Sequence, residues 1–245
     1  MSDKKTFRRL LSQSTGEAPK FSYSDLMEIR RVEEQKTSQA YVLQKEVNRS
    51  ESIIGRSGIL PIHQGCSLEN YVVNCQGQQN ALDYSTWFVN DFHLNNGSSF
   101  IFSGTPGTGK NHLSAAICNA LMADNKRCLV ITVSELMMRL NSCYGENAKM
   151  SEEQFFEGMT KLDLLVIDEV GIGRTSSNAA NNERLAINQV IDKRLCHLKP
   201  TGILTNLGQK EINDQLGSRI MSRMRNDNGQ WISFDWEDYR TAQRN

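Results

Sequence analysis

The sequence lacks four features that mark specialised classes of protein. No apolar run approaches the roughly 18 residues that a membrane-spanning helix needs, so we expect no membrane span. The six cysteines contain no C-x-x-C pair, which argues against a zinc site or a disulfide framework. The 28 basic and 28 acidic residues balance, so any nucleic-acid contact must come from a local patch. The N-terminus leads into polar sequence rather than a signal-peptide core, which predicts a cytoplasmic protein.

The N-terminal residues are polar and carry few apolar side chains, which predicts a small helical region with a narrow apolar stripe. Ser22 and Asp25 have the spacing of a capping box that would begin a helix. So thin a stripe cannot form its own core. It would bind a partner protein, dock on its own domain or remain a tail, and composition leaves these alternatives open. Gly58 and Pro61 indicate a linker, so we expect one domain over 1–55 and another over 56–245.

Beyond that boundary, short apolar segments alternate with segments of helical periodicity. Strands that are apolar on both faces and separated by helices predict a parallel sheet covered on both sides, an α/β domain. Five strands are expected at about 98–103, 128–133, 164–167, 201–205 and 231–234. Helices are expected at about 78–93, 110–123, 134–142, 151–160 and 183–197, and the sequence from Ser151 to Gln154 predicts a helix cap.

The segment from Gly104 to Lys110 has the pattern of a phosphate-binding loop, Gly-x4-Gly-Lys, and follows an apolar strand. Its glycines let backbone N–H groups point at phosphates, and the lysine ammonium reaches the outer phosphates. A helix that begins at the loop adds its positive end. A glycine-rich turn before a helix would not explain the lysine. The predicted nucleotide site comprises Gly104, Thr105, Pro106, Gly107, Thr108, Gly109, Lys110, Asn111 and His112.

Two acids end the third predicted strand, at the sheet edge where ligands bind in open α/β folds. In P-loop ATPases the first acid holds Mg²⁺ and the second orients the attacking water, and Asp168 and Glu169 would fill these roles. Asn111 stands where a Ser or Thr hydroxyl normally serves the ion. Its amide oxygen can ligate Mg²⁺ or bind water on it. We predict a Mg²⁺ site at Asn111 and Asp168, with slow ATP hydrolysis.

Two further polar positions are candidates for the chemistry of hydrolysis. Asn206 follows a strand and would contact the γ-phosphate or the attacking water, although asparagine is also a common turn residue. Arg219, Arg223 and Arg225 accompany apolar residues at helical spacing and project from the other faces. An arginine delivered into a neighbouring subunit's site would stabilise the transferring phosphoryl group. Three arginines on an exposed helix are equally typical of a solvated or anion-binding face.

Together these motifs resemble the DnaC family of bacterial replicative helicase loaders, which are AAA+ ATPases. The resemblance covers roughly residues 50 to 241, and it rests on Lys110-Asn111-His112, Leu164 to Glu169, Leu204 to Asn206, Arg219 to Arg225, Arg56 to Ile59 and Phe234 to Arg240. It implies an AAA+ P-loop NTPase domain with a five-stranded parallel sheet and no C-terminal lid. It also implies that Asn111 is inherited and that Arg219 is the arginine finger.

The resemblance further implies a function. The N-terminal region would bind a replicative hexameric DNA helicase, and the protein would deliver it onto single-stranded DNA under the control of ATP, self-associating in a spiral. The family has a DNA-contacting helical element between the second and third strands, where Arg139, Tyr144 and Lys149 lie. Basic and aromatic residues suit single-stranded DNA. Arg174, in the loop after Glu169, is a further candidate, and a mobile surface helix and loop is the alternative reading.

Two other functions remain compatible with the sequence. A transposition-helper ATPase has a closely similar core and would remodel a transposase. Phages and plasmids also carry such loaders. A non-hydrolysing adaptor, such as a phage protein, would bind the host helicase and hold nucleotide as a structural ligand, although Lys110, Asp168 and Glu169 are intact. No convincing second sensor arginine is present, and Arg240 is only a candidate for that role.

Overall fold

The computed structural model describes residues 27, 28, 30–32, 57–94, 97–145, 148–171, 177–225 and 229–239. The chain divides into two units, Met1–Arg49 and Ser50–Asn245. In the first unit the described residues are helical. The predicted helix cap at Ser22 and Asp25 lies outside the described residues. Among the described residues, no helix combines the length and the apolarity needed to cross a membrane.

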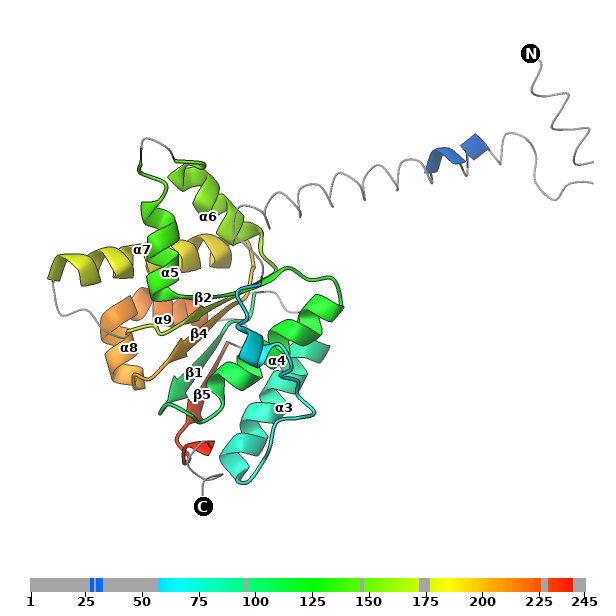
Figure 1. The fold of residues 1–245 in the computed structure, drawn as a ribbon, viewed down its shortest axis with the longest axis vertical. Coiled ribbons are helices and arrows are strands. Elements are labelled where there is room, and N and C mark those ends of the chain that lie inside the picture. The colour runs from blue at the N-terminus through cyan, green and yellow to red at the C-terminus, as the bar shows by residue number, and fades with distance from the viewer. Residues whose placement is uncertain are drawn as a thin grey trace, which may run out of the picture. The chain divides into compact units, whose positions relative to one another are not determined.

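The second unit is built on a five-stranded sheet in the order β2-β3-β4-β1-β5. All strand pairs are parallel, so the carboxyl ends of the strands share one edge (Figure 1). This arrangement confirms the predicted α/β class with a parallel five-stranded sheet. The strands are β1 Phe100–Gly104, β2 Cys128–Thr132, β3 Leu164–Asp168, β4 Thr201–Thr205 and β5 Gln230–Phe234.

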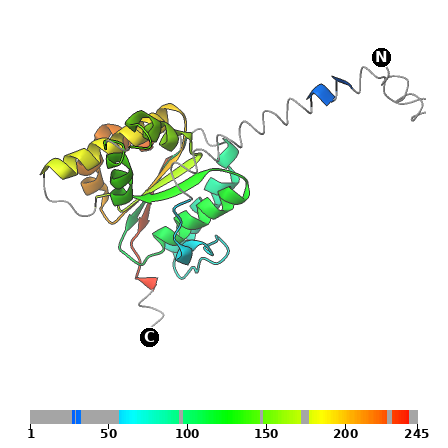
Figure 2. The same ribbon diagram turned by 45° about the horizontal axis from the view of Figure 1, so that its top comes forward.

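Helices cover both faces of the sheet (Figures 1 and 2). Phe100 and Phe102 of β1 pack in the core under one helical layer, and Ile101 between them packs in the core under the other. Because neighbouring strand residues serve opposite cores, each strand reads as a continuous apolar run. One layer is α3 Gln76–Asn90 and α4 Lys110–Ala123; the other is α5 Val133–Asn141, α6 Glu152–Lys161, α7 Ser177–Cys196, α8 Gln209–Leu216 and α9 Ser218–Met224.

Most predicted elements lie within three residues of their observed bounds. The predicted cap of α6 is confirmed, since the Ser151 hydroxyl accepts a hydrogen bond from the backbone N–H of Gln154 at 3.2 Å. Helix α7 begins at Ser177, earlier than the predicted start near 183, because its first turns carry no apolar periodicity. Helix α8 was not predicted, because only Ile212 and Leu216 of its eight residues are buried.

The segment around Gly58, interpreted from its sequence as a linker, is attached to the sheet. The backbone N–H of Val130 in β2 donates to the carbonyl oxygen of Ser57 at 2.8 Å. Ile59 is buried in the core beneath α3 and α4. Gly58 has a φ of 67°, and a Cβ there would collide with the carbonyl group of Val130. Close approach to β2 therefore requires this glycine. The next turn is the 3₁₀ helix η1 Pro61–His63.

Arg194, near the end of α7, is fully buried. Its guanidinium joins the end of α6, the loop before β3 and the start of β4. Burial lowers the pKa of Arg194 to about 9, and the Asp163 carboxylate partly opposes this shift. The guanidinium donates to the carbonyl oxygens of Met159, Leu162, Asp163 and Pro200 and to the hydroxyl of Thr201, at 2.5 to 3.5 Å.

Candidate nucleotide site

A cleft of about 500 Å³ lies where β1, β3 and β4 end. Its lining brings together residues from the phosphate-binding loop, the first turn of α4 and the ends of two strands. The loop, β3 and β4 are far apart in the sequence. They meet here because parallel strands end at the same edge of the sheet. The predicted site residues that line the cleft are Pro106, Gly107, Gly109, Lys110, Asn111, His112, Asp168, Glu169 and Asn206.

The phosphate-binding loop is closed by its own side chains. The ammonium of Lys110 donates to the carbonyl oxygens of Gly104 and Thr105, both at 2.7 Å. The hydroxyl of Thr108 donates to the carbonyl of Thr105 at 2.8 Å. Gly104, Thr105 and Thr108 are not among the residues lining the cleft, so they shape the loop from behind. The loop therefore holds a compact conformation around its lysine.

Asn111 and Asp168, which both line the cleft, contact each other. The side-chain nitrogen of Asn111 donates to one carboxylate oxygen of Asp168 at 2.8 Å. A carboxylate is an acceptor only, so this bond turns the amide nitrogen toward Asp168 and leaves the amide oxygen for another ligand. The second carboxylate oxygen of Asp168 accepts from the backbone N–H of Glu169 at 2.7 Å. Asn111 thus holds the Asp168 carboxylate in place.

Glu169 has an unusual backbone conformation. Its φ is 61°, in the left-handed region that non-glycine residues seldom adopt. Strain of this kind clusters at functional sites. The side chain is exposed and lines the cleft. The backbone therefore presents this carboxylate to the cleft rather than to the core.

Strand β4 reaches the cleft through Thr205 and Asn206. The buried hydroxyl of Thr205 donates to the carbonyl oxygen of Val170 at 2.7 Å, and it accepts from the backbone N–H of Leu207 at 3.0 Å. Asn206 is exposed beside it and lines the cleft. Thr205 therefore ties the end of β4 to the segment that follows Glu169. No motif in the sequence predicts this role of Thr205.

The remaining lining of the cleft comes from Tyr239, which follows β5, and from a wall at residues 61–66, which was not predicted because it matches no motif. Ile62, His63 and Cys66 line the cleft. Helix α4 holds this wall. The amide nitrogen of Asn119 lies 2.8 to 3.2 Å from the carbonyl oxygens of His63, Gln64 and Cys66.

Two histidines, His63 in this wall and His112 on α4, line the cleft. The Nε2 of His112 lies 3.1 Å from the carbonyl oxygen of Ser67, just beyond the wall. His112 thus lines the cleft and also contacts the segment that follows residues 61–66. Burial lowers the pKa of His63, the charge of His112 lowers it further, and Asp168 raises it in part. The surroundings of His63 therefore favour its neutral form.

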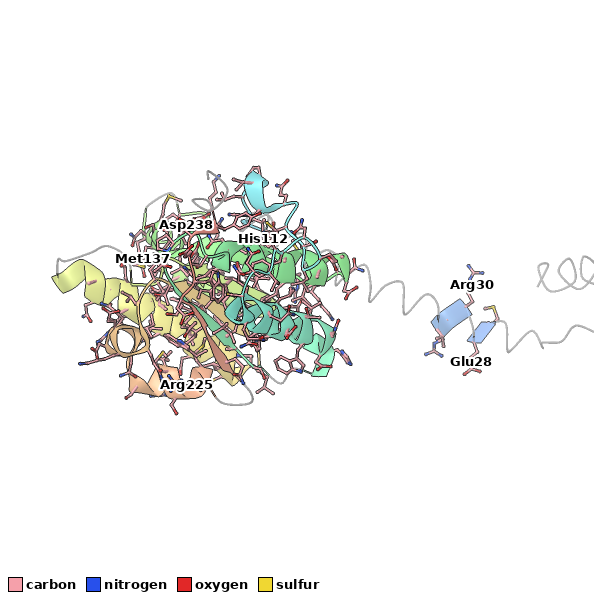
Figure 3. The ribbon with its side chains drawn as sticks, turned by 90° about the horizontal axis from the view of Figure 1, so that it is seen from below. Glu28, Arg30, His112, Met137, Arg225 and Asp238 are labelled. Carbon is pink, nitrogen blue, oxygen red and sulfur yellow. The ribbon has the colours of Figure 1, made fainter. Side chains whose placement is uncertain are left out.

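Arg219 lies outside the cleft, on α9. Its side chain is 79% exposed, with a guanidinium nitrogen 3.8 Å from a carboxylate oxygen of Asp192. Arg223 pairs with the same carboxylate and is partly buried. In Figure 3, Arg225, which follows α9, lies on the side opposite His112 and Asp238. Of the arginines on α9 itself, Arg219 is thus the one whose side chain extends into solvent.

Of the predicted DNA-contacting residues, the three that the structure describes, Arg139, Tyr144 and Lys149, do not line the cleft. Arg139 pairs with Glu135 on α5, with Nε 3.1 Å from the carboxylate oxygen. Tyr144 is 61% exposed and follows α5, and Lys149 is exposed before α6. Arg174 and Arg240 lie outside the described residues. Across the part of the chain that the structure describes, no three His, Cys, Asp or Glu side chains form a metal-binding cluster.

Comparisons with known proteins agree with the resemblance seen in the motifs. Residues 9–227 match the family model described as IstB-like ATP binding protein. The replicative helicase loader DnaC of Escherichia coli strain K12 is 46% identical over 193 residues, which cover 79% of this chain and 76% of that protein. DnaC of Buchnera aphidicola subsp. Schizaphis graminum is 35% identical over 237 residues, 96% of this chain and 94% of that protein.

The fold is also similar to solved structures. The crystal structure of the DnaC helicase loader superposes with a TM-score of 0.61 at 23% identity and covers 71% of this chain and 99% of that chain. This likeness concerns the fold alone, and the sequence matches carry the family assignment. The chain therefore belongs to the IstB-like ATP-binding protein family, as a relative of the DnaC replicative helicase loaders.

Proposed function

We propose that this protein is an ATP-dependent loader that binds a replicative hexameric DNA helicase and delivers it onto single-stranded DNA, with ATP binding and hydrolysis controlling assembly and release. The observation that carries the proposal is the meeting of Lys110, Asn111 and Asp168 in one cleft of a chain 46% identical to a replicative helicase loader. Loader domains self-associate in a spiral on the helicase.

The side chains of the cleft fit Mg²⁺ bound with ATP. Asp168 offers a carboxylate and Asn111 an amide oxygen, both hard oxygen ligands of the kind that Mg²⁺ takes. Their hydrogen bond keeps the two groups together on one side of the cleft. Mg²⁺ keeps several waters and phosphate oxygens in its shell, so two protein groups suffice. Bound there, the ion would neutralise charge on the phosphates.

Each remaining side chain has a defined task in this proposal. Lys110 leaves the carbonyl oxygens that it now contacts and binds the outer phosphates. Glu169 orients the attacking water, and Asn206 at the end of β4 contacts the γ-phosphate or that water. Hydrolysis is slow, because the amide of Asn111 replaces the hydroxyl ligand of faster P-loop enzymes and makes a different Mg²⁺ shell.

Two variants separate binding from hydrolysis. Lys110→Ala is expected to weaken ATP binding about 100-fold or more, because the phosphates lose a charge-assisted partner. Glu169→Gln is expected to keep the affinity and to slow hydrolysis on the order of 10²-fold or more. Calorimetry gives the affinities and phosphate release gives the rates. Glu153→Gln, an exposed acid on α6, is the matched control. Unaltered turnover in Glu169→Gln would remove this residue from the chemistry.

Capture and loading of a helicase test the function itself. The tagged protein is expected to retain a replicative hexameric helicase more tightly with ATP than without it. It should also transfer the helicase to circular single-stranded DNA. We propose that Arg139, Tyr144, Lys149 and Arg174 contact this DNA, so Tyr144→Ala should reduce transfer without reducing capture. Selective retention of a transposase, with no helicase, would contradict the proposal.

A further inference from the structure

The chain beyond β5 runs along the phosphate-binding loop, and its Tyr239 reaches the lining of the cleft. The indole Nε1 of Trp236 donates to the carbonyl oxygen of Thr108 at 2.9 Å. The backbone N–H of Tyr239 donates to the carbonyl oxygen of Gly107 at 3.1 Å. Between them, Asp238 lies so close to Gly107 that a Cβ there would overlap its carboxylate. Two successive loop carbonyls are thus bound from outside by one segment.

Trp236 is itself held by parts of the domain that do not belong to the loop. Its ring lies 4.8 Å, centroid to centroid, from the ring of Phe234, which is fully buried at the end of β5. Its other neighbour is Gly77 of α3, where a Cβ would come within 2.9 Å of the indole. A strand and a helix therefore fix the indole, and its N–H points at a defined place.

The loop needs such an external donor. For its N–H groups to turn inward toward phosphates, its carbonyl oxygens must turn outward, where each requires a partner. Thr108 is 2% exposed, so water has little access to it. Gly107 and Gly109 have φ values of 79° and 95°, a conformation that glycine loses much entropy to adopt. A fixed donor outside the loop lowers the cost of ordering it when nucleotide binds.

We propose that Trp236 is a positioning residue of the nucleotide site. Its indole N–H, held by α3 and β5, keeps the phosphate-binding loop in the conformation that receives the phosphates. Trp236 touches no phosphate and acts through the carbonyl of Thr108. The inference rests on the nucleotide binding proposed above, and it adds the requirement that the segment after β5 governs affinity.

The first test compares Trp236, which follows β5, with Trp231, which lies within β5. Trp236→Phe removes the N–H and keeps an aromatic ring against Phe234 and Gly77. Trp231→Phe is the matched control, because the Trp231 indole bonds to Ser233 at 3.2 Å and packs against the core on the other side of the sheet. Trp236→Phe is expected to weaken binding of both MgATP and ADP about 5- to 30-fold, with Trp231→Phe unchanged.

Thermal unfolding without nucleotide separates positioning from general stability. A purely structural role would lower the melting temperature of the nucleotide-free Trp236→Phe protein. It would leave the affinity for nucleotide unchanged at temperatures where the protein is folded. We expect the reverse, with both tryptophan variants melting within a few degrees of each other. Affinity equal to that of the unaltered protein in Trp236→Phe would overturn the inference while leaving nucleotide binding intact.

The three tryptophans of the chain permit a spectroscopic test. Replacing Trp87 and Trp231 by phenylalanine leaves Trp236 as the single emitter. Its fluorescence is expected to change as MgATP or ADP is added, with the same dissociation constant as calorimetry gives, because phosphates add charge beside its hydrogen-bond partner. Unchanged emission at saturating nucleotide would overturn the role of Trp236. Failure of the unaltered protein to bind any nucleotide would overturn both this inference and the proposed function.

Discussion

Replacing Arg194 by methionine is expected to lower the free energy of unfolding by about 3–5 kcal/mol. The methionine would fill much of the volume, but it donates no hydrogen bond. Four backbone carbonyls and the Thr201 hydroxyl, all bound now by the guanidinium, would lose that partner together. Each buried polar group left without a partner costs about 1–3 kcal/mol, reduced where the structure can relax.

Denaturant unfolding measures this loss, and α7 supplies the control. Arg184→Met changes an exposed arginine on the same helix and is expected to alter stability by no more than about 0.5 kcal/mol. Arg194→Lys should recover only part of the stability, because an ammonium lacks the planar fork that reaches several carbonyls at once. Equal stability of Arg194→Met and Arg184→Met would show that the buried guanidinium contributes nothing net.

Arg219→Ala is expected to slow ATP hydrolysis on the order of 10³-fold in the assembled protein, with little effect on ATP affinity. The side chain is 79% exposed and does not line the cleft of its own domain. It can therefore serve as an arginine finger only in a neighbouring subunit's site. Single-turnover phosphate release in the presence of the helicase measures the effect, and Arg225→Ala is the comparison, expected to cost no more than a few-fold.

Mixing two inactive proteins tests whether Arg219 acts between subunits. Lys110→Ala subunits would bind ATP too weakly to hydrolyse it but would still offer Arg219, and Arg219→Ala subunits would bind ATP but offer no finger. Hydrolysis is expected to reappear in the mixture, with a dependence on protein concentration. No recovery at any ratio would contradict action between subunits and would favour a non-hydrolysing adaptor.

The strands and the phosphate-binding loop could be predicted because their determinants are local. Phe100, Ile101 and Phe102 form an apolar run since each faces one of two cores, and the glycines and lysine of the loop follow directly. Acids at the end of β3 meet the loop because parallel strands share a carboxyl edge. For the strands and the loop, a short stretch of sequence is enough to determine the local structure.

The missed features depend on contacts between distant residues. Trp236 and Thr108 are 128 positions apart, and Asn119 and Cys66 are 53 apart, so no periodicity records either pair. The burial of Arg194 could not be predicted either, because its hydrogen-bond partners lie on α6, before β3 and at the start of β4, and they meet only after folding. Asn111 was identified from its position in the motif, yet the hydrogen bond that it donates to Asp168 required the meeting of α4 and β3.

The amide of Asn119 has a mechanical consequence for the cleft. One side chain on α4 gathers three carbonyl oxygens of the wall at residues 61–66, and the same helix begins at Lys110. Helix α4 therefore holds both the wall and Lys110, so the distance between them stays constant. Any segment that closes on a bound nucleotide would therefore be one that α4 does not hold, such as the ends of β3 and β4, the segment after β5 or part of another subunit.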